Sequence, residues 1–251
     1  MGDIFQLLGY RDRLVSVGTK IDKKALYENA EISAVEKKII IDGIEKMQIE
    51  YLLNSKTINI SSYQDEDKIY QAVVILRVYL KNINNVDKIA QILQKSFPNP
   101  TIIFFEYGNE ICISTAHKRI NKLDKEKAIC GEINLTGFIP IDKINEVDKK
   151  FLESIKINNL PFSDFYDFYS FIDEAVYLYK KSNLLGKYEI EQDEEKRRIR
   201  KQLIEEYERL NNELAKITKQ IKKETQFNKK AQLNMEAVKI KSKIDELKQK
   251  L

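Results

Sequence analysis

The stretch KIYQAVVILRVYLK, residues 68–81, decides the fold class of this chain. It is long and rich in β-branched residues, which is typical of a central β-strand. The next segment, VDKIAQILQKSF at 86–97, has the apolar spacing of an amphipathic helix, and Pro98 ends it. TIIFFE, residues 101–106, is expected to form a second strand. Strand, helix and strand across 69–107 predict a crossover unit in a mixed or otherwise antiparallel sheet.

The segments on either side complete an α+β pattern. Expected strands are KMQIEYLLN (46–54), TINIS (57–61) and KAICGEINLTGFIPI (127–141), and expected helices span 33–46, 142–157 and 163–182. Ser33 is a candidate N-cap of the first helix. The last helix carries aromatic residues at i, i+4 spacing, which favours a helix that covers one face of the sheet over a platform for stacked bases. We predict a mixed β-sheet domain with flanking helices over residues 1–186.

From about residue 187 the pattern becomes that of a coiled coil. Apolar residues recur at alternating spacings of four and three along two seams, Leu203, Tyr207, Leu210, Leu214, Ile217 and Ile221, and then Leu233, Ala237, Ile240, Ile244, Leu247 and Leu251. The seams are out of phase, because extending the first by heptads reaches Ala231, Met235 and Val238. A helical hairpin with a turn near 224–229 explains the shift, with one long helix as the alternative. We predict a coiled-coil helical arm over 187–251, which binds its own other half, a second copy in a homodimer, or a different protein.

The composition limits the class of protein. Residues 187–251 contain 18 Lys and Arg against 13 Asp and Glu, a net charge of +5, whereas residues 1–186 contain 25 against 26, a net charge of −1. The two cysteines, Cys112 and Cys130, are too few for a disulfide framework. No apolar run approaches the roughly 20 residues of a membrane span. We expect a cytoplasmic protein without a membrane segment.

The hairpin PNPTIIFFEYGNEICISTAHKRI, residues 98–120, carries an acid and the only histidine, which raises the question of a metal-dependent nuclease. Restriction-type nucleases place an acid and a Glu-x-Lys motif on adjacent strands. With Gly108-Asn109 as the turn, Glu106 lies opposite Ile111. The seven residues from there to Lys118 span roughly 23 Å at about 3.3 Å each. Glu106 and Lys118 therefore cannot form one active site.

Other catalytic motifs are also missing from the sequence. His117 has no carboxylate partner that the sequence can name, and there is no Gly-x-Ser-x-Gly elbow, phosphate-binding glycine motif or metal-ligand spacing. The catalytic residues are therefore unknown, we expect no metal and no cofactor, and a non-enzymatic role is favoured.

Basic residues offer a second kind of site. KRRIRK at 196–201 and TKIDKK at 19–24 would both attract a phosphate backbone. Acids such as Glu205 and Glu206 are interleaved with the basic residues of the arm, which favours local pairing there. The candidate anion- or nucleic-acid-binding residues are Lys20, Lys23, Lys118, Arg119, Lys196, Arg197 and Arg200. Convergence of Lys20 and Lys118 on one cleft would create an anion site.

Several segments resemble one bacterial family, the domain-of-unknown-function family 4391. They are TKIDKKALYEN (19–29), TINIS (57–61), SFPNPTIIFFE (96–106), AHKR (116–119) and KETQFNKKAQLNME (223–236). The residues that match the family pattern are Lys20, Lys23, Tyr27, Thr57, Asn59, Pro98, Pro100, Lys118, Phe227 and Asn228. Members of this family look like neighbours of DNA methyltransferases and helicases of restriction-modification or antiphage type. The resemblance implies an accessory role in such a system, with a helicase or methyltransferase as protein partner.

Three functions are consistent with these observations. The favoured one is a non-catalytic accessory or interaction protein of a DNA-processing system, in which the α+β domain docks DNA or a DNA-processing enzyme and the coiled-coil arm binds a partner protein. The first alternative is a divergent metal-dependent nuclease of the same system, and the second is a self-assembling coiled-coil scaffold.

Overall fold

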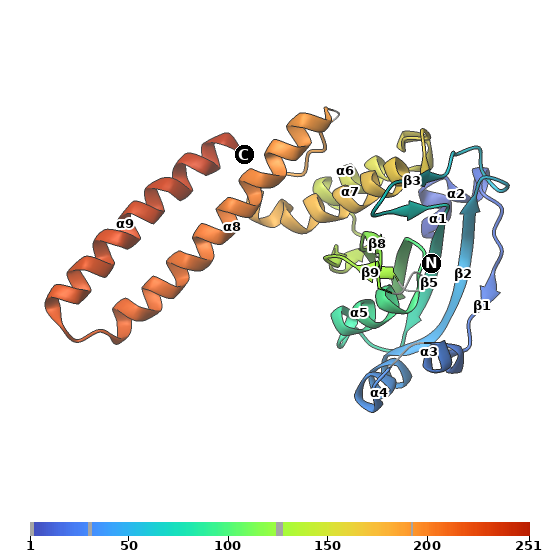
Figure 1. Cartoon of the computed structure of the whole chain (residues 1–251), viewed down its shortest axis with the longest axis horizontal. Coiled ribbons are helices and arrows are strands. Elements are labelled where there is room, and N and C mark those ends of the chain that lie inside the picture. Colours follow the sequence, from blue (N-terminus) through green and yellow to red (C-terminus); the bar gives the residue numbers. More distant parts are fainter. Residues whose placement is uncertain (1–2, 30–31, 124–127, 192) are drawn as a thin grey trace. The chain divides into compact units, whose positions relative to one another are not determined.

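The computed structural model describes residues 3–29, 32–123, 128–191 and 193–251. The chain divides into two units, Met1–Tyr188 and Glu189–Leu251 (Figure 1). The first contains the sheet and its helices, and the second contains two long helices.

A mixed sheet forms the centre of the first unit, with strand order β1-β2-β5-β6-β7-β10 and with β11 also paired to β7. The strands are β1 (Thr19–Lys20), β2 (Ile44–Asn54), β5 (Ala72–Leu80), β6 (Thr101–Tyr107), β7 (Glu110–Thr115), β10 (Asn134–Leu135) and β11 (Ile139–Pro140). β5 and β6 are parallel, and α5 (Val86–Ser96) connects them. The other neighbouring pairs of described strands in this sheet are antiparallel. This topology confirms the predicted crossover unit and the α+β class.

The predicted tight hairpin is formed by β6 and β7. Gly108 adopts a left-handed φ of 55°, a conformation that a residue with a Cβ rarely adopts. Tyr107 pairs with Glu110 across the turn, and Glu106 lies opposite Ile111, as predicted. This register places the Glu106 side chain on the same face of the sheet as that of Ile111.

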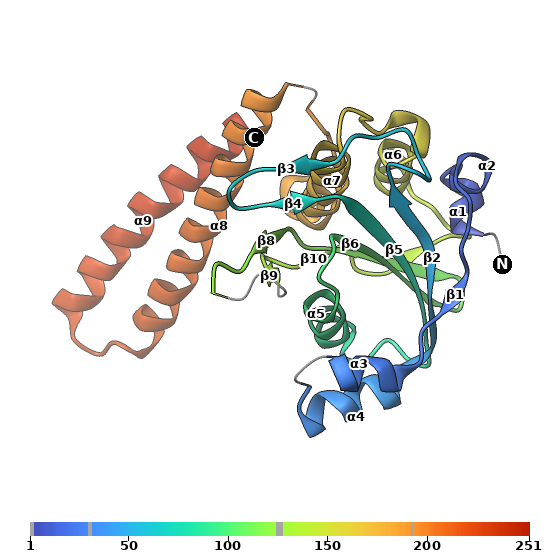
Figure 2. The same cartoon turned by 45° about the vertical axis from the view of Figure 1, so that its right-hand side comes forward.

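One face of the sheet is covered by α3 (Lys23–Asn29), α4 (Ala34–Gly43) and α5, as Figure 2 shows. Their apolar side chains pack with those of β2, β5 and β6 in one buried cluster, which includes Ile40, Leu76, Ile89 and Phe105. Burying these side chains, at about 1.5–3 kcal/mol each, holds the helices to the sheet.

The helix predicted over 33–46 ends earlier than expected. Ser33 caps it, as predicted, in a capping box, but the helix stops at Gly43 and β2 begins at Ile44. Ile44 is fully buried, so its place in the core of the sheet outweighs the helical spacing that predicted a longer helix. A Cβ at Gly43 would lie 2.5 Å from Ile89 Cδ1, so any larger residue at this position would require the end of the Ile89 side chain to move.

The opposite face of the sheet is covered by four further helices, α1 (Ile4–Leu7), α2 (Tyr10–Arg13), α6 (Glu146–Ser154) and α7 (Phe165–Leu185), with a short 3-10 helix η1 (Ile157–Asn159) after α6. In α7, the side chains of Phe165, Phe168, Tyr169 and Ile172 are at most 1% exposed. The aromatic helix therefore covers the sheet, as predicted, and these rings are not available to stack on bases.

Two small hairpins, β3 (Tyr63–Gln64) with β4 (Ile69–Tyr70) and β8 (Lys118–Ile120) with β9 (Ala128–Cys130), extend from this core. The strand predicted over 57–61 is wrong, because Thr57 donates to the Leu52 carbonyl and accepts the Asn54 N–H. Such side-chain bonds to the backbone favour a turn over a strand. The segment 127–141 was predicted as one strand, and its described part forms three short strands, β9, β10 and β11.

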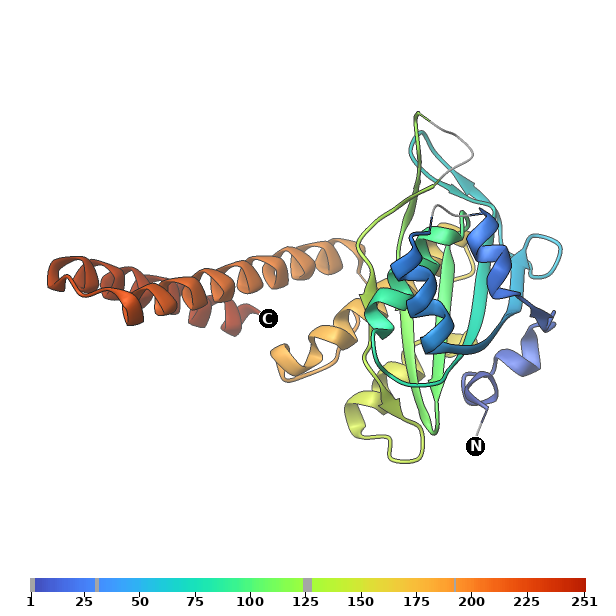
Figure 3. The same ribbon diagram turned by 90° about the horizontal axis from the view of Figure 1, so that it is seen from below.

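The second unit is a hairpin of α8 (Glu194–Lys223) and α9 (Phe227–Lys250), joined by residues 224–226. The two helices lie side by side in Figure 1, and in the view of Figure 3 α9 passes behind α8. Both predicted seams pack in one cluster, which contains Tyr207, Leu210, Leu214, Ile217, Ile221, Leu233, Ala237, Ile240, Ile244, Leu247 and Leu251. The predicted helical hairpin is confirmed, because the two seams bind each other. Leu203 is half-buried and is not a member of this cluster.

Candidate functional site

A pair of buried charges lies on the sheet face that α1 and α2 cover. Arg77 of β5 donates through Nε to Glu106 Oε1 at 2.8 Å and through Nη2 to Glu106 Oε2 at 3.1 Å. The Glu106 side chain is 2% exposed and that of Arg77 is 13% exposed. The parallel register places Tyr79 beside Glu106 and Arg77 beside Phe104, so the two charged side chains share one face of the sheet. This two-pronged geometry is the strongest form of a protein ion pair.

The pair extends into a network through Asp3 and Arg11. Arg11 Nε donates to Asp3 Oδ2 at 2.7 Å, and Arg11 Nη1 donates to Glu50 Oε1 at 2.5 Å. Arg77 Nη1 lies 3.5 Å from Asp3 Oδ1 and so joins the two halves. Glu50, whose side chain is 2% exposed, also accepts a hydrogen bond from Gln48 Nε2 at 2.6 Å.

This network is chemically suited to hold the sheet and the N-terminal helices together. Burial acts against the charge of Arg11, but its hydrogen bonds to Asp3 and Glu50 raise the pKa of the guanidinium. Burial raises the pKa of Glu106, and the neighbouring Arg77 opposes that rise. Among the described residues, no group of three or more His, Cys, Asp or Glu side chains is placed to hold a metal ion. The carboxylates face arginines instead.

His117 has the carboxylate partner that the sequence did not reveal. Its Nε2 lies 3.5 Å from Asp173 Oδ2 of α7, and its Nδ1 lies 2.7 Å from the hydroxyl of Tyr70 in β4. The Tyr70 hydroxyl also accepts the Lys118 N–H at 3.2 Å, so it joins His117 to the backbone of β8. Asn134 Nδ2 holds the other carboxylate oxygen of Asp173 at 3.2 Å.

Aromatic rings pack beside this cluster, although the His117 side chain remains 37% exposed. The rings of Tyr166 and Tyr169 lie 5.7 Å and 5.5 Å from the His117 ring, and the buried Tyr169 hydroxyl accepts the Ala116 N–H at 2.8 Å. Burial raises the pKa of Tyr70 and that of Tyr169, so both phenols stay protonated. Tyr70 is 0% exposed, so it has no surface for a substrate. The cluster therefore joins α7 to β4 and to the link between β7 and β8.

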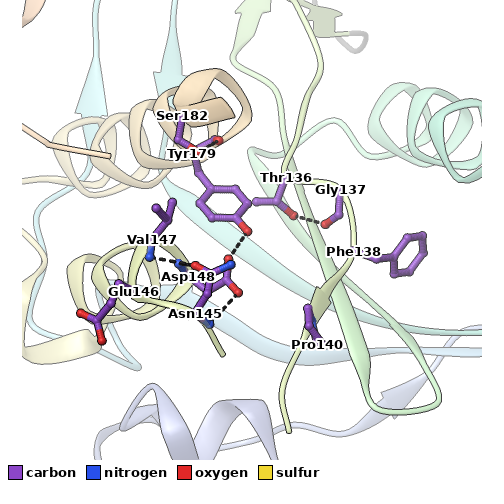
Figure 4. A pocket seen from close by; sticks show the side chains of 10 residues that line it. All are labelled: Thr136, Gly137, Phe138, Pro140, Asn145, Glu146, Val147, Asp148, Tyr179 and Ser182. Atoms are coloured by element: carbon purple, nitrogen blue, oxygen red, sulfur yellow. Dashed lines mark hydrogen bonds between the residues drawn. The ribbon is translucent and has the colours of Figure 1, made fainter. Parts of the chain in front are cut away.

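A cavity of about 580 Å³ lies between the β10–β11 segment and helices α6 and α7 (Figure 4). It is lined by Thr136, Gly137, Phe138, Pro140, Asn145, Glu146, Val147, Asp148, Tyr179 and Ser182. Tyr179 donates to Asp148 Oδ1 at 2.6 Å, and the Asn145 N–H donates to Asp148 Oδ2 at 3.1 Å. Burial, followed by the hydrogen bond to Asp148, raises the pKa of Tyr179. Asn145 and Asp148 of this lining form the capping box of α6. The lining includes no Lys or Arg, which makes the cavity unsuited to an anion.

The basic excess of the arm lies in one continuous stretch that runs from the last two turns of α8 through the turn and along most of α9. We call this stretch, residues 216–243, the distal half, because it comprises about half of the residues of the two helices and includes the turn. It contains nine basic residues, Lys216, Lys219, Lys222, Lys223, Lys229, Lys230, Lys239, Lys241 and Lys243, all of them exposed. The only acids in this range are Glu224 and Glu236, so the net charge is +7 (9 minus 2).

The remainder of the two helices is balanced in charge. Residues 194–213 and 245–250 contain eight basic and eight acidic residues. Several of these pair locally, as in Arg209, which lies 2.6 Å from Glu206 and 3.3 Å from Glu213. The distal half is therefore the strongest positive feature of the hairpin.

The predicted anion-binding residues of the first unit lie apart. Lys118 is 4% exposed, its ammonium donates to the Gln94 carbonyl in the last turn of α5, and burial lowers its pKa. Lys20 is exposed on the edge strand β1, and three strands separate β1 from β7, which leads to β8. Lys20 and Lys118 therefore do not converge. Lys23 Nζ donates to the Ile44 carbonyl, and Arg119 is exposed.

The predicted anion-binding residues of the second unit lie in the part of the hairpin where basic and acidic residues are equal in number. Lys196 is exposed and Arg197 is half-buried. Arg200 is 9% exposed, and its Nη1 donates to the Glu189 carbonyl at 3.1 Å.

One residue in the sequence could have predicted the charge network, but it was not used in the prediction. Arg77 interrupts the otherwise apolar strand AVVILRVYL, and a charged residue within a buried strand needs a partner. Asp173, the partner of His117, lies in a helix 56 positions further along the chain (173 minus 117), so sequence spacing offered no signal for it.

The family model described as Domain of unknown function (DUF4391) matches residues 14–244, most of the chain, and the chain belongs to this family. The resemblance found in the sequence is thereby confirmed. No curated protein and no solved structure matches the chain. The matched range includes Glu50, Arg77, Glu106 and the whole distal half, whereas Asp3 and Arg11 precede it.

Proposed function

We propose that this member of the DUF4391 family is a non-catalytic accessory protein of a DNA-processing system, of restriction-modification or antiphage type. In the cytoplasm it docks a partner enzyme, a helicase or a methyltransferase, and contacts DNA through the distal half of its helical hairpin. In this proposal residues 1–186 form one domain and the coiled-coil arm, residues 187–251, forms another.

The observation that carries the proposal is the charge of the distal half. Its net charge of +7 lies on exposed side chains, while the apolar seam of the hairpin is closed inside. Duplex DNA carries one negative charge per about 1.7 Å, so a protein that presents several lysines releases counterions and gains affinity. Lysine ammonium groups on long exposed stems suit backbone contact without base recognition.

The non-catalytic part of the proposal rests on the polar clusters of the first unit. The carboxylates of the charge network are engaged by Arg11 and Arg77, and His117 is held between Asp173 and Tyr70. The partner class follows from the family resemblance, since members of the family look like neighbours of DNA methyltransferases and helicases.

A charge-relocation experiment tests DNA contact. Two quadruple variants of the full chain carry glutamine in place of four exposed lysines: a distal variant at Lys222, Lys223, Lys229 and Lys230, and a matched variant at Lys196, Lys201, Lys248 and Lys250. Both remove four positive charges, so they differ only in where the charge is lost.

Affinity for a fluorescein-labelled duplex is measured by anisotropy over a salt series. We expect the distal variant to lose affinity and to lower the slope of log K against log salt by up to about 3.6, or about 0.9 per lost phosphate contact. The matched variant should retain most of the parent slope. Equal losses in both variants, or no binding by the parent chain, would contradict the proposal.

The nuclease alternative has one observation in its favour, because Asp3, Glu50 and Glu106 belong to one network. It predicts cleavage of supercoiled or linear DNA with Mg²⁺ or Mn²⁺, and loss of that cleavage in Glu50→Gln. The arginines that hold these carboxylates favour the accessory role.

The scaffold alternative requires self-association through the coil. A homodimer through the predicted seam would have to open the hairpin, because the seam residues of α8 and α9 already pack together. Light scattering that shows a monomer at micromolar concentration would remove this alternative.

A further inference from the structure

Helix α9 has a second apolar stripe on the side opposite its seam. Phe227, Met235 and Val238 are 84%, 64% and 66% exposed, and Ala231 between them is also exposed. Their spacings of four, four and three place them on one face of the helix. Ala231, Met235 and Val238 each precede a seam residue by two positions. Two positions correspond to a rotation of about 200° around the helix axis, so these side chains point away from the seam. We call these four residues the outer stripe.

The outer stripe accounts for most of the large apolar side chains that the hairpin exposes. Within the described residues of the second unit, four such side chains are exposed, and three of them belong to the stripe, with Ile199 as the fourth. A helix that is apolar on two opposite faces is typical of a helix packed between others in a bundle. α8 covers one of these faces, and the other has the spacing of a seam for a further helix.

The lysines beside the stripe indicate which kind of partner fits it. Lys230 and Lys241 flank it on one side and Lys239 and Lys243 on the other, all exposed. A second copy of the chain would bring one distal half of net charge +7 against another, which like-charge repulsion opposes. The DNA backbone has the charge to match the lysines but no apolar surface to cover the stripe. An acidic amphipathic helix provides both.

We propose that the outer stripe binds an amphipathic helix of a protein partner, with apolar residues at seam spacing and with Asp or Glu on either side of that seam. The inference rests on the proposed function, since it states the chemistry of the partner that the arm docks. The stripe spans 227–238, about 17 Å at 1.5 Å per residue, so it accommodates about three turns of a partner helix.

The probe is a synthetic helical peptide of about three heptads, with leucine at the a and d positions and glutamate at the e and g positions. Its matched control has glutamine in place of each flanking glutamate. Binding to the full chain is followed by anisotropy of the labelled peptide. The test variant is M235Q/V238Q, which changes exposed side chains only, and circular dichroism checks that it keeps the parent helix content.

We expect the acidic peptide to bind the parent chain at least about tenfold more tightly than it binds M235Q/V238Q, and more tightly than the glutamine peptide binds the parent chain. Equal affinity of the acidic peptide for parent and variant would overturn the inference. So would self-association of the parent chain that M235Q/V238Q abolishes, which would assign the stripe to a second copy. Stripe-dependent binding to phosphatidylglycerol vesicles without peptide binding would assign it to a lipid surface and also overturn the inference.

A second pair of measurements separates this inference from DNA contact. K216Q/K219Q removes two distal lysines of α8 outside the stripe, and we expect it to weaken duplex binding more than peptide binding. M235Q/V238Q should weaken peptide binding and leave duplex affinity unchanged. A parent chain that binds the peptide but not the duplex therefore contradicts the proposed DNA contact alone. A parent chain that binds the duplex but not the peptide contradicts the docking of an acidic helix alone.

Discussion

Replacing Arg77 by methionine tests whether the carboxylates of the sheet face belong to an ion-pair network or to a metal site. The substitution keeps an unbranched side chain in β5 and removes the two-pronged partner of Glu106, whose side chain is 2% exposed. Removing one partner of a buried ion pair costs about 3–5 kcal/mol, because the other charge stays buried and unpaired. Arg77 keeps some contact with water, at 13% exposure, so we expect a loss of about 3 kcal/mol. For a unit of this size the melting temperature should fall by about 6–12 °C.

The double variant R77M/E106Q is the control for this loss. It leaves no unpaired charge, so we expect it to recover stability, with a coupling free energy of about 2 kcal/mol between the two sites. The loss in R77M should also depend on pH. Burial raises the pKa of Glu106 and Arg77 opposes that rise, so without Arg77 the pKa rises further. A raised carboxyl pKa favours folding at low pH, and this contribution is lost as pH rises through the folded pKa. The cost of R77M should therefore be larger at about pH 8 than at about pH 5.

Thermal and urea unfolding followed by far-UV circular dichroism measure these quantities, with and without Mg²⁺ or Mn²⁺. A loss below about 1 kcal/mol in R77M, or single effects that simply add in the double variant, would refute an ion-pair network. Stabilisation of the parent chain by Mn²⁺ that Glu106→Gln removes would support a metal site instead.

Three further predictions concern the buried lysine, the seam and the arm. Burial lowers the pKa of Lys118, so the unfolded chain binds that proton more readily than the folded chain does. The free energy of unfolding should therefore rise with pH between the lowered pKa and the pKa of the unfolded chain. Lys118→Met should flatten this rise in thermal melts over about pH 7–10, and an unchanged rise would contradict the prediction. Ile240 is 6% exposed in the seam, so I240A should lower the free energy of unfolding of the hairpin by about 2–4 kcal/mol, whereas V238A on the exposed face should cost less than about 0.5 kcal/mol in the same urea titration. Deleting residues 189–251 should leave a folded first unit, seen as a cooperative melt, and should abolish co-purification with a helicase or methyltransferase partner; retained co-purification would argue against the arm as the docking element.

Local patterns of the sequence predicted much of the fold. The apolar strand at 72–80, the helix ended by Pro98 and the turn at Gly108 each have a strong local cause, and each forms where expected. The out-of-phase seams of the arm likewise required a turn, and it lies at 224–226. Prediction was weaker where tertiary contacts decide the structure. Ile44 begins β2 because the core buries it.

The candidate sites depended on contacts that no spacing reveals. Asp173 meets His117 because α7 crosses the sheet next to the β7–β8 link. Arg11 meets Glu50 because the N-terminal helices fold over β2. Lys118 matched a basic pattern, yet the fold directs its ammonium to the end of α5. The charge of residues 216–243 could be read from composition, but which of these lysines lie beside the turn could be stated only once the turn was located.

The central claim, that the distal half of the hairpin contacts DNA, is tested most directly by site-specific crosslinking in the intact chain. Gln226 lies in the turn and Gln249 near the C-terminal end of α9, and both are exposed glutamines. Each is replaced in turn by a photoreactive amino acid, and the protein is irradiated with a labelled duplex. The account predicts a DNA adduct from position 226 and little from position 249. Equal adducts from both positions, or an adduct from position 249 alone, would contradict it.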